Sequence, residues 1–303
     1  NTRTPPLYGD LIKINGNQVF EKAAIYENKN FINFGYLIYD SLDTSAFLSL
    51  DYLARQKALL EYVILDGGNK TLPENLSKNR FTVFAENIKV ENGNLSFTIP
   101  EIVGAEVYVL IEGLVKENHT KVFEVTYETD DVKYRDTASP KGANTYKENA
   151  VQLVNLGYYD NYLNLKVNIT FTDGIYNINR ISYGLLETDN LDERASLLNA
   201  GSLKDLKLYG NGFSGNITAM RKGYLFVGIP YSKGFTAKID GKETKILKAN
   251  MSFIAIEVPE GTHEVIFTYV TPGLIPALFI SLTAAVITAG ITCFHIYRKR
   301  NKL

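Results

Sequence analysis

The sequence predicts a mainly β protein that contains one or more β-sandwiches, with a small α/β region before them and one transmembrane helix at the C-terminus. Apolar and polar residues alternate at a period of two through much of the chain, in short runs separated by turn residues. Near the C-terminus a long apolar run carries no charge. Since a half-buried strand needs a second sheet over its apolar face, the alternating runs favour a sandwich.

These patterns divide the chain into three parts. We expect a mixed α/β region at residues 1–78, a β-sandwich region at residues 79–271, and a transmembrane helix with a basic tail at residues 272–303. A break near residue 203 would divide the sandwich region into two sub-domains. No apolar leader occurs in the first residues, so we expect this sequence to be the tail of a longer protein.

The first part contains a predicted hairpin and a predicted helix. The runs Ile12–Asn15 and Val19–Glu27 flank the turn Asn15-Gly16-Asn17, which is typical of a β-hairpin. Leu48 to Leu65 has apolar residues at helical spacing, which predicts one amphipathic helix that ends before Asp66.

The middle part changes to a period of two. The predicted strands are Leu95–Ile99, Glu106–Leu114, Lys121–Thr129 and Leu163–Phe171. We expect a long loop from Asp130 to Lys147. A helix is predicted from Leu191 to Asn199, because Asn190 and Glu193 have the spacing of a capping box.

The last predicted strands lie directly before the apolar run. Leu225–Ile229 is one strand, and Phe235–Ile239 leads to Asp240-Gly241, a pair suited to a type I′ turn because both positions need positive φ. Phe253–Val258 and Thr262–Val270 are expected to pair with each other across the intervening turn. Gly212-Phe213-Ser214-Gly215 lacks the final glycine of a nucleophile elbow, and we expect it to be a turn.

The uncharged run extends from Leu274 to Tyr297. At about 1.5 Å per residue it reaches about 36 Å, enough to cross a hydrocarbon core of about 30 Å. The basic residues Arg298, Lys299, Arg300 and Lys302 follow it, so the positive-inside rule places the C-terminus in the cytoplasm and the preceding residues outside the cell.

Composition narrows the class of protein. The formal net charge is -1 with no basic stripe, which excludes nucleic acid as an expected partner. The lone cysteine, Cys293, lies in the membrane run, so the rest of the chain has no disulfide. Animal ectodomains of this size usually have some, and we therefore expect a bacterial cell membrane protein. His119, His263 and His295 are widely spaced, and we expect no metal site and no cofactor.

Two groups of residues are candidates for ligand binding. Asp130 and Asp131 could line a calcium or sugar site, although acidic loop residues are usually only solvated. Tyr158 and Tyr159 could stack on sugar rings, although in a chain with 20 tyrosines sheet packing is the simpler explanation.

A block of residues before the membrane run resembles the C-terminal signature of YfhO-type bacterial membrane proteins. The signature positions are Gly234, Phe235, Asp240, Gly241, Asn250, Phe253, Gly261, His263 and Tyr269. The order of elements is also similar, since in that family the block immediately precedes the last transmembrane helix. Phe235 is a departure, because the family usually has tryptophan there.

The resemblance implies a protein with many transmembrane helices, similar to glycosyltransferases that use polyprenyl-phosphate sugars to glycosylate lipoteichoic acid and related surface polymers. Its partners would be the lipid bilayer, the lipid-linked sugar and the polymer acceptor. The catalytic carboxylate of such enzymes lies in an early loop, so no catalytic residue is expected in this chain, and the signature residues are expected to be structural. On this resemblance, the present chain would shape or cover the acceptor side of the sugar-transfer site. The alternative is a membrane-anchored carbohydrate-binding or structural surface module without catalysis.

Overall fold

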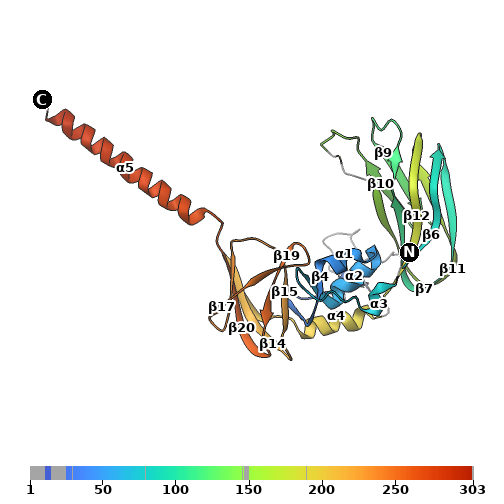
Figure 1. The fold of residues 1–303 in the computed structure, drawn as a ribbon, viewed down its shortest axis with the longest axis horizontal. Helices are drawn as coiled ribbons and strands as arrows, with labels where there is room; N and C mark the ends of the chain where they lie inside the picture. The colour runs from blue at the N-terminus through green and yellow to red at the C-terminus, as the bar shows by residue number, and fades with distance from the viewer. Residues whose placement is uncertain are drawn as a thin grey trace. The chain divides into compact units, whose positions relative to one another are not determined.

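The computed structural model describes residues 11–14, 25–28, 30–78, 80–144, 146, 150–188 and 190–301. Most of the described elements are antiparallel strands, and one long apolar helix follows them at the C-terminus (Figure 1), so the predicted fold class is confirmed. The chain divides into two compact units. Unit 1 comprises residues 1–33 and 41–200, and unit 2 comprises residues 34–40 and 201–303.

Unit 1 is built on a seven-stranded sheet in the order β10-β9-β11-β7-β12-β6, with β8 also paired to β12. Its strands are β6 (Phe81–Glu91), β7 (Asn94–Glu112), β8 (Val115–Lys116), β9 (Phe123–Glu128), β10 (Lys133–Ala138), β11 (Val151–Phe171) and β12 (Ile175–Glu187). The long strands β7 and β11 pair along most of their lengths, with one register shift between Asn155 and Gly157.

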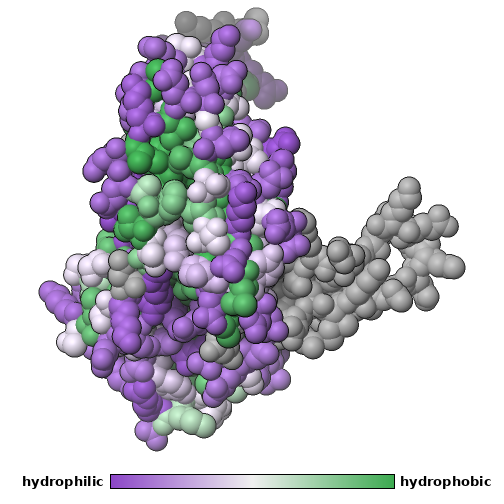
Figure 2. All heavy atoms as spheres, turned by 90° about the vertical axis from the view of Figure 1, so that its right-hand side faces the viewer, coloured by the Kyte–Doolittle hydropathy of each residue, from purple (hydrophilic) through white to green (hydrophobic). Residues whose placement is uncertain are grey.

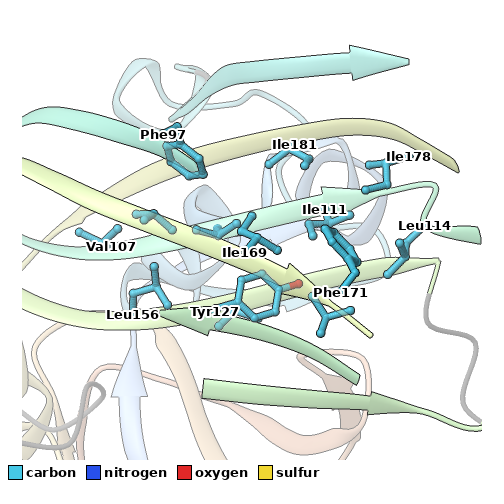
Figure 3. Packing of buried hydrophobic residues seen from close by; sticks show 14 of the residues in the cluster. Phe97, Val107, Ile111, Leu114, Tyr127, Leu156, Ile169, Phe171, Ile178 and Ile181 are labelled. Carbon is cyan, nitrogen blue, oxygen red and sulfur yellow. The ribbon is translucent and has the colours of Figure 1, made fainter. Parts of the chain in front are cut away.

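The core of unit 1 follows the alternation of the central strand. Val107 and Ile111 of β7 point into a cluster that also contains Tyr127 and Leu156 (Figure 3), and Val109 belongs to the same cluster. The alternate residues Glu106, Tyr108 and Leu110 lie on the opposite face of β7, as successive strand residues must, and they are also buried. Both faces of this part of β7 are therefore covered.

Unit 1 also contains shorter elements, of which α2 packs on the second face of the sheet. They are β4 (Asp40–Asp43), α1 (Thr44–Ser49), α2 (Tyr52–Glu61), β5 (Tyr62–Leu65), α3 (Glu74–Ser77) and α4 (Leu191–Ala200). Leu53 of α2 is fully buried, and a Cβ at Gly184 of β12 would lie 2.7 Å from its Cδ1. This close approach brings α2 onto the sheet.

The predicted helix from Leu48 to Leu65 is wrong in its extent. Leu50 is extended, and the side chain of Asp51 accepts hydrogen bonds from the backbone N–H groups of Leu53 and Ala54, so a new helix starts there. The last part of the prediction is the buried strand β5. The apolar residues of α1 and α2 follow one helical spacing, so their sequence resembles that of a single longer helix.

Three further predictions fall in unit 1. The predicted loop from Asp130 to Lys147 is wrong in part, because it contains β10, which pairs with β9. The two segments of the predicted N-terminal hairpin are antiparallel neighbours, β1 (Leu11–Ile14) and β2 (Ile25–Asn28), but Ile14 lies opposite Ile25, a register that a tight turn at Asn15-Gly16-Asn17 does not give. Its predicted turn Asn15-Gly16-Asn17 lies outside the described residues. The predicted helix at Leu191 is confirmed as α4.

Figure 2 shows one face of the molecule, on which apolar side chains gather in the upper half. Unit 1 has apolar side chains that remain exposed on its strands, among them Val103 and Leu163 at more than 60% exposure. The sheet is therefore not fully covered by the short elements.

Unit 2 is a β-sandwich. One sheet has the order β13-β14-β20-β16-β17, and the strands β3, β15, β19 and β18 lie side by side in the other. Their bounds are β3 (Tyr36–Ile38), β13 (Lys204–Tyr209), β14 (Gly212–Ala219), β15 (Gly223–Pro230), β16 (Phe235–Ile239), β17 (Lys242–Thr244), β18 (Ile246–Ala249), β19 (Phe253–Val258) and β20 (Gly261–Tyr269). Val265 and Phe267 of the first sheet share one core with Val227 and Ile256 of the second.

Two sequence predictions for unit 2 are wrong. The strands β19 and β20 follow each other in the chain but do not pair, because β19 bonds to β15 and β18 whereas β20 bonds to β14 and β16. The segment starting at Gly212 is a strand and not a turn, and the Ser214 hydroxyl lies 2.6 Å from the hydroxyl of Tyr209.

The C-terminal helix α5 extends from Leu274 to Arg300 and has basic residues in its last turn. Within the described part of the chain it is the one helix long and apolar enough to cross a membrane. Gly273 in the left-handed region precedes it, and the Leu274 N–H donates to the Thr271 carbonyl (3.0 Å). The predicted membrane run is therefore a continuous helix.

Candidate functional site

Unit 1 contains a cleft of about 450 Å³ beside the second face of its sheet. It is lined by residues of α2, the end of β12, the start of α4 and one residue of β7: Gln56, Lys57, Leu60, Glu61, Glu106, Leu186, Glu187, Thr188, Asn190, Leu191, Glu193, Arg194 and Leu197. Carboxylates, amides and aliphatic side chains thus line the same hollow. This volume lies within the range of small-molecule sites in proteins, about 300–1,000 Å³.

Glu106 is the most buried charged residue of the cleft, at 7% exposure. Its Oε2 accepts hydrogen bonds from the Tyr108 hydroxyl (2.8 Å) and from the Asn155 Nδ2 (3.2 Å). Tyr108 also lies 3.4 Å from the Gln56 Oε1. Among the described residues no donor reaches the Glu106 Oε1. One carboxylate oxygen is therefore fixed and the other is open to a ligand.

The surroundings change the acidity of this group. Burial raises the pKa of the Glu106 carboxyl above its ordinary value, and the hydrogen bonds from Tyr108 and Asn155 offset part of that effect. Burial and the nearby carboxylate also raise the pKa of Tyr108. A carboxyl in a cleft with a pKa raised by burial is a candidate functional group.

The other charged residues of the cleft are partly paired. Lys57 lies 3.7 Å from Glu187, and the Arg194 Nε donates to the Leu60 carbonyl (2.8 Å). Leu60 and Leu186 add apolar surface. A polyhydroxylated ligand can donate hydrogen bonds from its hydroxyl groups to the carboxylates and amides of the cleft. Its C–H faces can contact the leucine side chains, so the lining suits a ligand of this class.

The candidates Asp130 and Asp131 lie in the tight turn between β9 and β10. The Thr129 Oγ1 accepts the backbone N–H of Asp131 (3.3 Å), and the Thr129 N–H donates to the Val132 carbonyl (2.8 Å). The Asp130 Oδ2 accepts a hydrogen bond from the Tyr162 hydroxyl (3.3 Å). Within the described residues no three His, Cys, Asp or Glu side chains are grouped to hold a metal ion.

The candidates Tyr158 and Tyr159 point to opposite faces of the sheet. Tyr159 is buried in the core, where its ring meets Tyr162 at 5.3 Å between centroids. Tyr158 is 48% exposed and lies directly opposite Glu106 in the pairing of β11 with β7. Directly paired residues share a face, so Tyr158 is on the same face as the cleft carboxylate.

Part of the signature block forms a locked turn in unit 2. Asp240 (φ 49°) and Gly241 (φ 79°) form the predicted turn between β16 and β17. The His263 Nδ1 donates to the Asp240 Oδ2 (2.7 Å), and the backbone N–H of Glu264 donates to Oδ1 (2.9 Å). These bonds raise the pKa of His263 and lower the pKa of Asp240. His263 thus fastens the turn to β20.

Other signature residues satisfy backbone and packing demands. Asn250 (φ 46°) is in the turn between β18 and β19, and Gly261 (φ 121°) begins β20 in a region that side chains rarely adopt. The Phe253 ring contacts Phe226 at 5.8 Å between centroids.

The remaining signature residues surround the exit of β20 toward α5. The Val270 N–H donates to the Gly234 carbonyl (2.9 Å), and the rings of Phe235 and Tyr269 lie 4.8 Å apart. A Cβ at Gly234 would lie 2.2 Å from the Val270 carbonyl oxygen and 3.1 Å from the Pro272 Cδ. We call this group, Gly234, Phe235, Tyr269, Val270 and Pro272, the exit joint.

Comparison with known families decides the identity. A family model described as "Bacterial membrane protein YfhO" matches residues 9–281. The chain belongs to the YfhO family. It is therefore a bacterial membrane protein, and the sequence resemblance is confirmed.

One curated relative is an uncharacterised YfhO protein of Bacillus subtilis (strain 168), which is 35% identical over 77 residues. The match covers 25% of this chain and 8% of the relative, so this YfhO family member aligns with a small part of the relative's length.

Solved structures give weaker similarities. A ruminal GH26 endo-β-1,4-mannanase matches with a TM-score of 0.21 and 12% identity, over 31% of this chain and 18% of the mannanase. A Paenibacillus cycloisomaltooligosaccharide glucanotransferase matches with a TM-score of 0.23 and 7% identity, over 59% of this chain and 41% of that enzyme. TM-scores this low support no conclusion about this YfhO family member.

The sequence predicts a strand that starts at Glu106, but no motif marks this residue as a candidate for the site. The available signal is the spacing of Glu106 and Tyr108, which puts a carboxylate and a phenol on one face of a strand that is otherwise apolar. The second face of β7 is also buried because of α2, which is distant from β7 in the sequence.

Proposed function

We propose that this chain is the extracytoplasmic C-terminal part of a YfhO-type protein that takes part in glycosylation of cell-surface polymers of the lipoteichoic acid class. The sugar donor would be a polyprenyl-phosphate-linked sugar, and the catalytic groups would lie elsewhere in the complete protein. This part would shape the acceptor side, with the Glu106 cleft holding hydroxyl-bearing groups of the polymer.

The observation that carries the proposal is the open oxygen of Glu106 in a cleft of mixed polar and aliphatic lining. Oε1 of this carboxylate accepts no hydrogen bond from the described residues, so a ligand hydroxyl can donate one to it. The basic end of α5 supports an orientation in which both β units face the outside of the cell.

The experiment replaces Glu106 by Gln in the complete protein and measures the sugar content of the surface polymer per phosphate. We expect the sugar content to fall strongly in Glu106→Gln. The matched control is Glu101→Gln, which removes an exposed carboxylate from the same strand outside the cleft and should leave the sugar content unchanged. Equal sugar content in both variants, at equal protein levels in the membrane, would refute a role of the cleft in glycosylation.

A second candidate function is a membrane-anchored carbohydrate-binding module without catalysis. The exposed ring of Tyr158, on the same face as Glu106, favours it as a stacking surface. This alternative predicts that the chain binds glycans, that Tyr158→Ala weakens the binding, and that deletion of the chain leaves polymer glycosylation unchanged. A purely structural module predicts neither glycan binding nor an effect of deletion on glycosylation.

A further inference from the structure

Unit 2 contains a second hollow, of about 420 Å³, which the function proposed above does not use. It lies along the segment between β15 and β16 and is bounded by β17 and the start of β18. Its lining residues are Tyr231, Ser232, Lys233, Phe235, Thr236, Ala237, Glu243, Thr244 and Ile246. The hollow therefore combines hydroxyl groups, one cation, one anion and apolar side chains.

The exit joint fixes this hollow close to the start of the membrane helix. Gly234, between the lining residues Lys233 and Phe235, bonds to Val270 and packs against Pro272. From Pro272 to the first residue of α5, Leu274, the chain can extend by about 7 Å. The headgroup layer on each side of a bilayer is about 5–7 Å thick, so the hollow lies at the depth of lipid headgroups if α5 crosses the membrane.

The hollow contains two charged side chains, Lys233 and Glu243. Among the described residues neither Lys233 nor Glu243 makes an ion pair, although both side chains are exposed. The Ser232 Oγ accepts the backbone N–H of Gly234 (3.3 Å), which leaves its own proton for donation. The site thus offers a cation with neighbouring hydroxyl donors and, separately, a carboxylate.

A ligand that carries both a phosphate and a primary ammonium group complements this arrangement. The phosphate would contact Lys233 and the hydroxyls of Ser232 and Thr236, and the ammonium would contact Glu243. We propose that the hollow binds the headgroup of a zwitterionic phospholipid of the phosphatidylethanolamine type. The apolar side chains of Phe235 and Ile246 would contact the carbon atoms of the headgroup. Such a contact would hold unit 2 against the bilayer beside α5.

The test uses the whole chain in detergent micelles and counts bound lipid by native mass spectrometry. Phosphatidylethanolamine, phosphatidylglycerol and phosphatidylcholine are compared at equal concentration. We expect at least about tenfold stronger binding of phosphatidylethanolamine, which is the effect of about 1.4 kcal/mol. Phosphatidylglycerol lacks the ammonium, and the quaternary ammonium of phosphatidylcholine cannot donate a hydrogen bond to Glu243.

Three variants locate the binding. Lys233→Gln should weaken binding of all three lipids, and Glu243→Gln should remove the preference for phosphatidylethanolamine over phosphatidylglycerol. Lys245→Gln changes an exposed lysine outside the hollow and should bind like the unchanged chain. Equal lipid binding by all variants, or no preference among the lipids, would overturn the proposal. Equally strong binding of soluble glycerophosphoethanolamine in lipid-free micelles would overturn the assignment to a membrane lipid.

Discussion

Replacing Gly234 by Ala should destabilise the exit joint by about 2–4 kcal/mol. The added Cβ would lie 2.2 Å from the carbonyl oxygen of Val270 and 2.6 Å from the Cε2 of Tyr269. Ordinary contacts begin near 3.4 Å, so the backbone of Val270 must move by about 1 Å, and overpacking of this kind costs about 1–3 kcal/mol. The movement also breaks the bond between the Val270 N–H and the Gly234 carbonyl, which adds about 1 kcal/mol.

The assay is amide hydrogen exchange of β16 and β20 in the whole chain in micelles, because it reports the local free energy of opening. The matched control is Gly228→Ala in β15, where a Cβ would meet nothing within 4 Å. That variant should be unchanged or more stable by about 0.5 kcal/mol, since alanine restricts the unfolded chain. Equal protection of β20 in the two variants would refute the argument that Gly234 is required for close approach.

Two other predictions concern the signature turn and the core of unit 1. The bond between His263 and Asp240 should stabilise unit 2 most between about pH 4 and pH 6.5. The contribution of His263 is lost as the pH rises through the raised pKa of its imidazole. The contribution of Asp240 is lost as the pH falls through the lowered pKa of its carboxyl. Asp240→Asn should flatten this dependence in thermal unfolding, and an unchanged pH profile would contradict the assignment. Leu53→Ala should destabilise unit 1 by about 2–5 kcal/mol, because the side chain is fully buried; a loss below about 1 kcal/mol in urea unfolding would show that α2 does not depend on this contact.

Local patterns in the sequence predicted the elements that depend on neighbouring residues. The alternation in β7 and β11 predicts most of their buried residues, although Leu163 is exposed, and the Asp240-Gly241 pair predicts a turn whose two positive φ angles the structure confirms. The uncharged run predicts the helix α5, because its length and apolarity can be read directly from the sequence.

Features that depend on distant residues could not be predicted in this way. β10 is an edge strand with mostly exposed side chains, so Lys133–Ala138 shows no apolar alternation. The sheet to which β19 or β20 belongs is decided by strands elsewhere in the chain, and adjacency in sequence suggested the wrong pairing. Glu106 lines the cleft only because separate elements of unit 1 lie over its face of the sheet.

The most direct test of the proposed acceptor cleft is calorimetric titration of the whole chain in micelles with unglycosylated surface polymer. We predict binding by the unchanged chain and by Glu101→Gln. Glu106→Gln should bind about 10–100-fold more weakly, because a hydrogen bond to a charged group contributes about 1.5–3 kcal/mol. Equal affinity of Glu106→Gln and Glu101→Gln for the polymer, or no binding by the unchanged chain, would contradict the proposal.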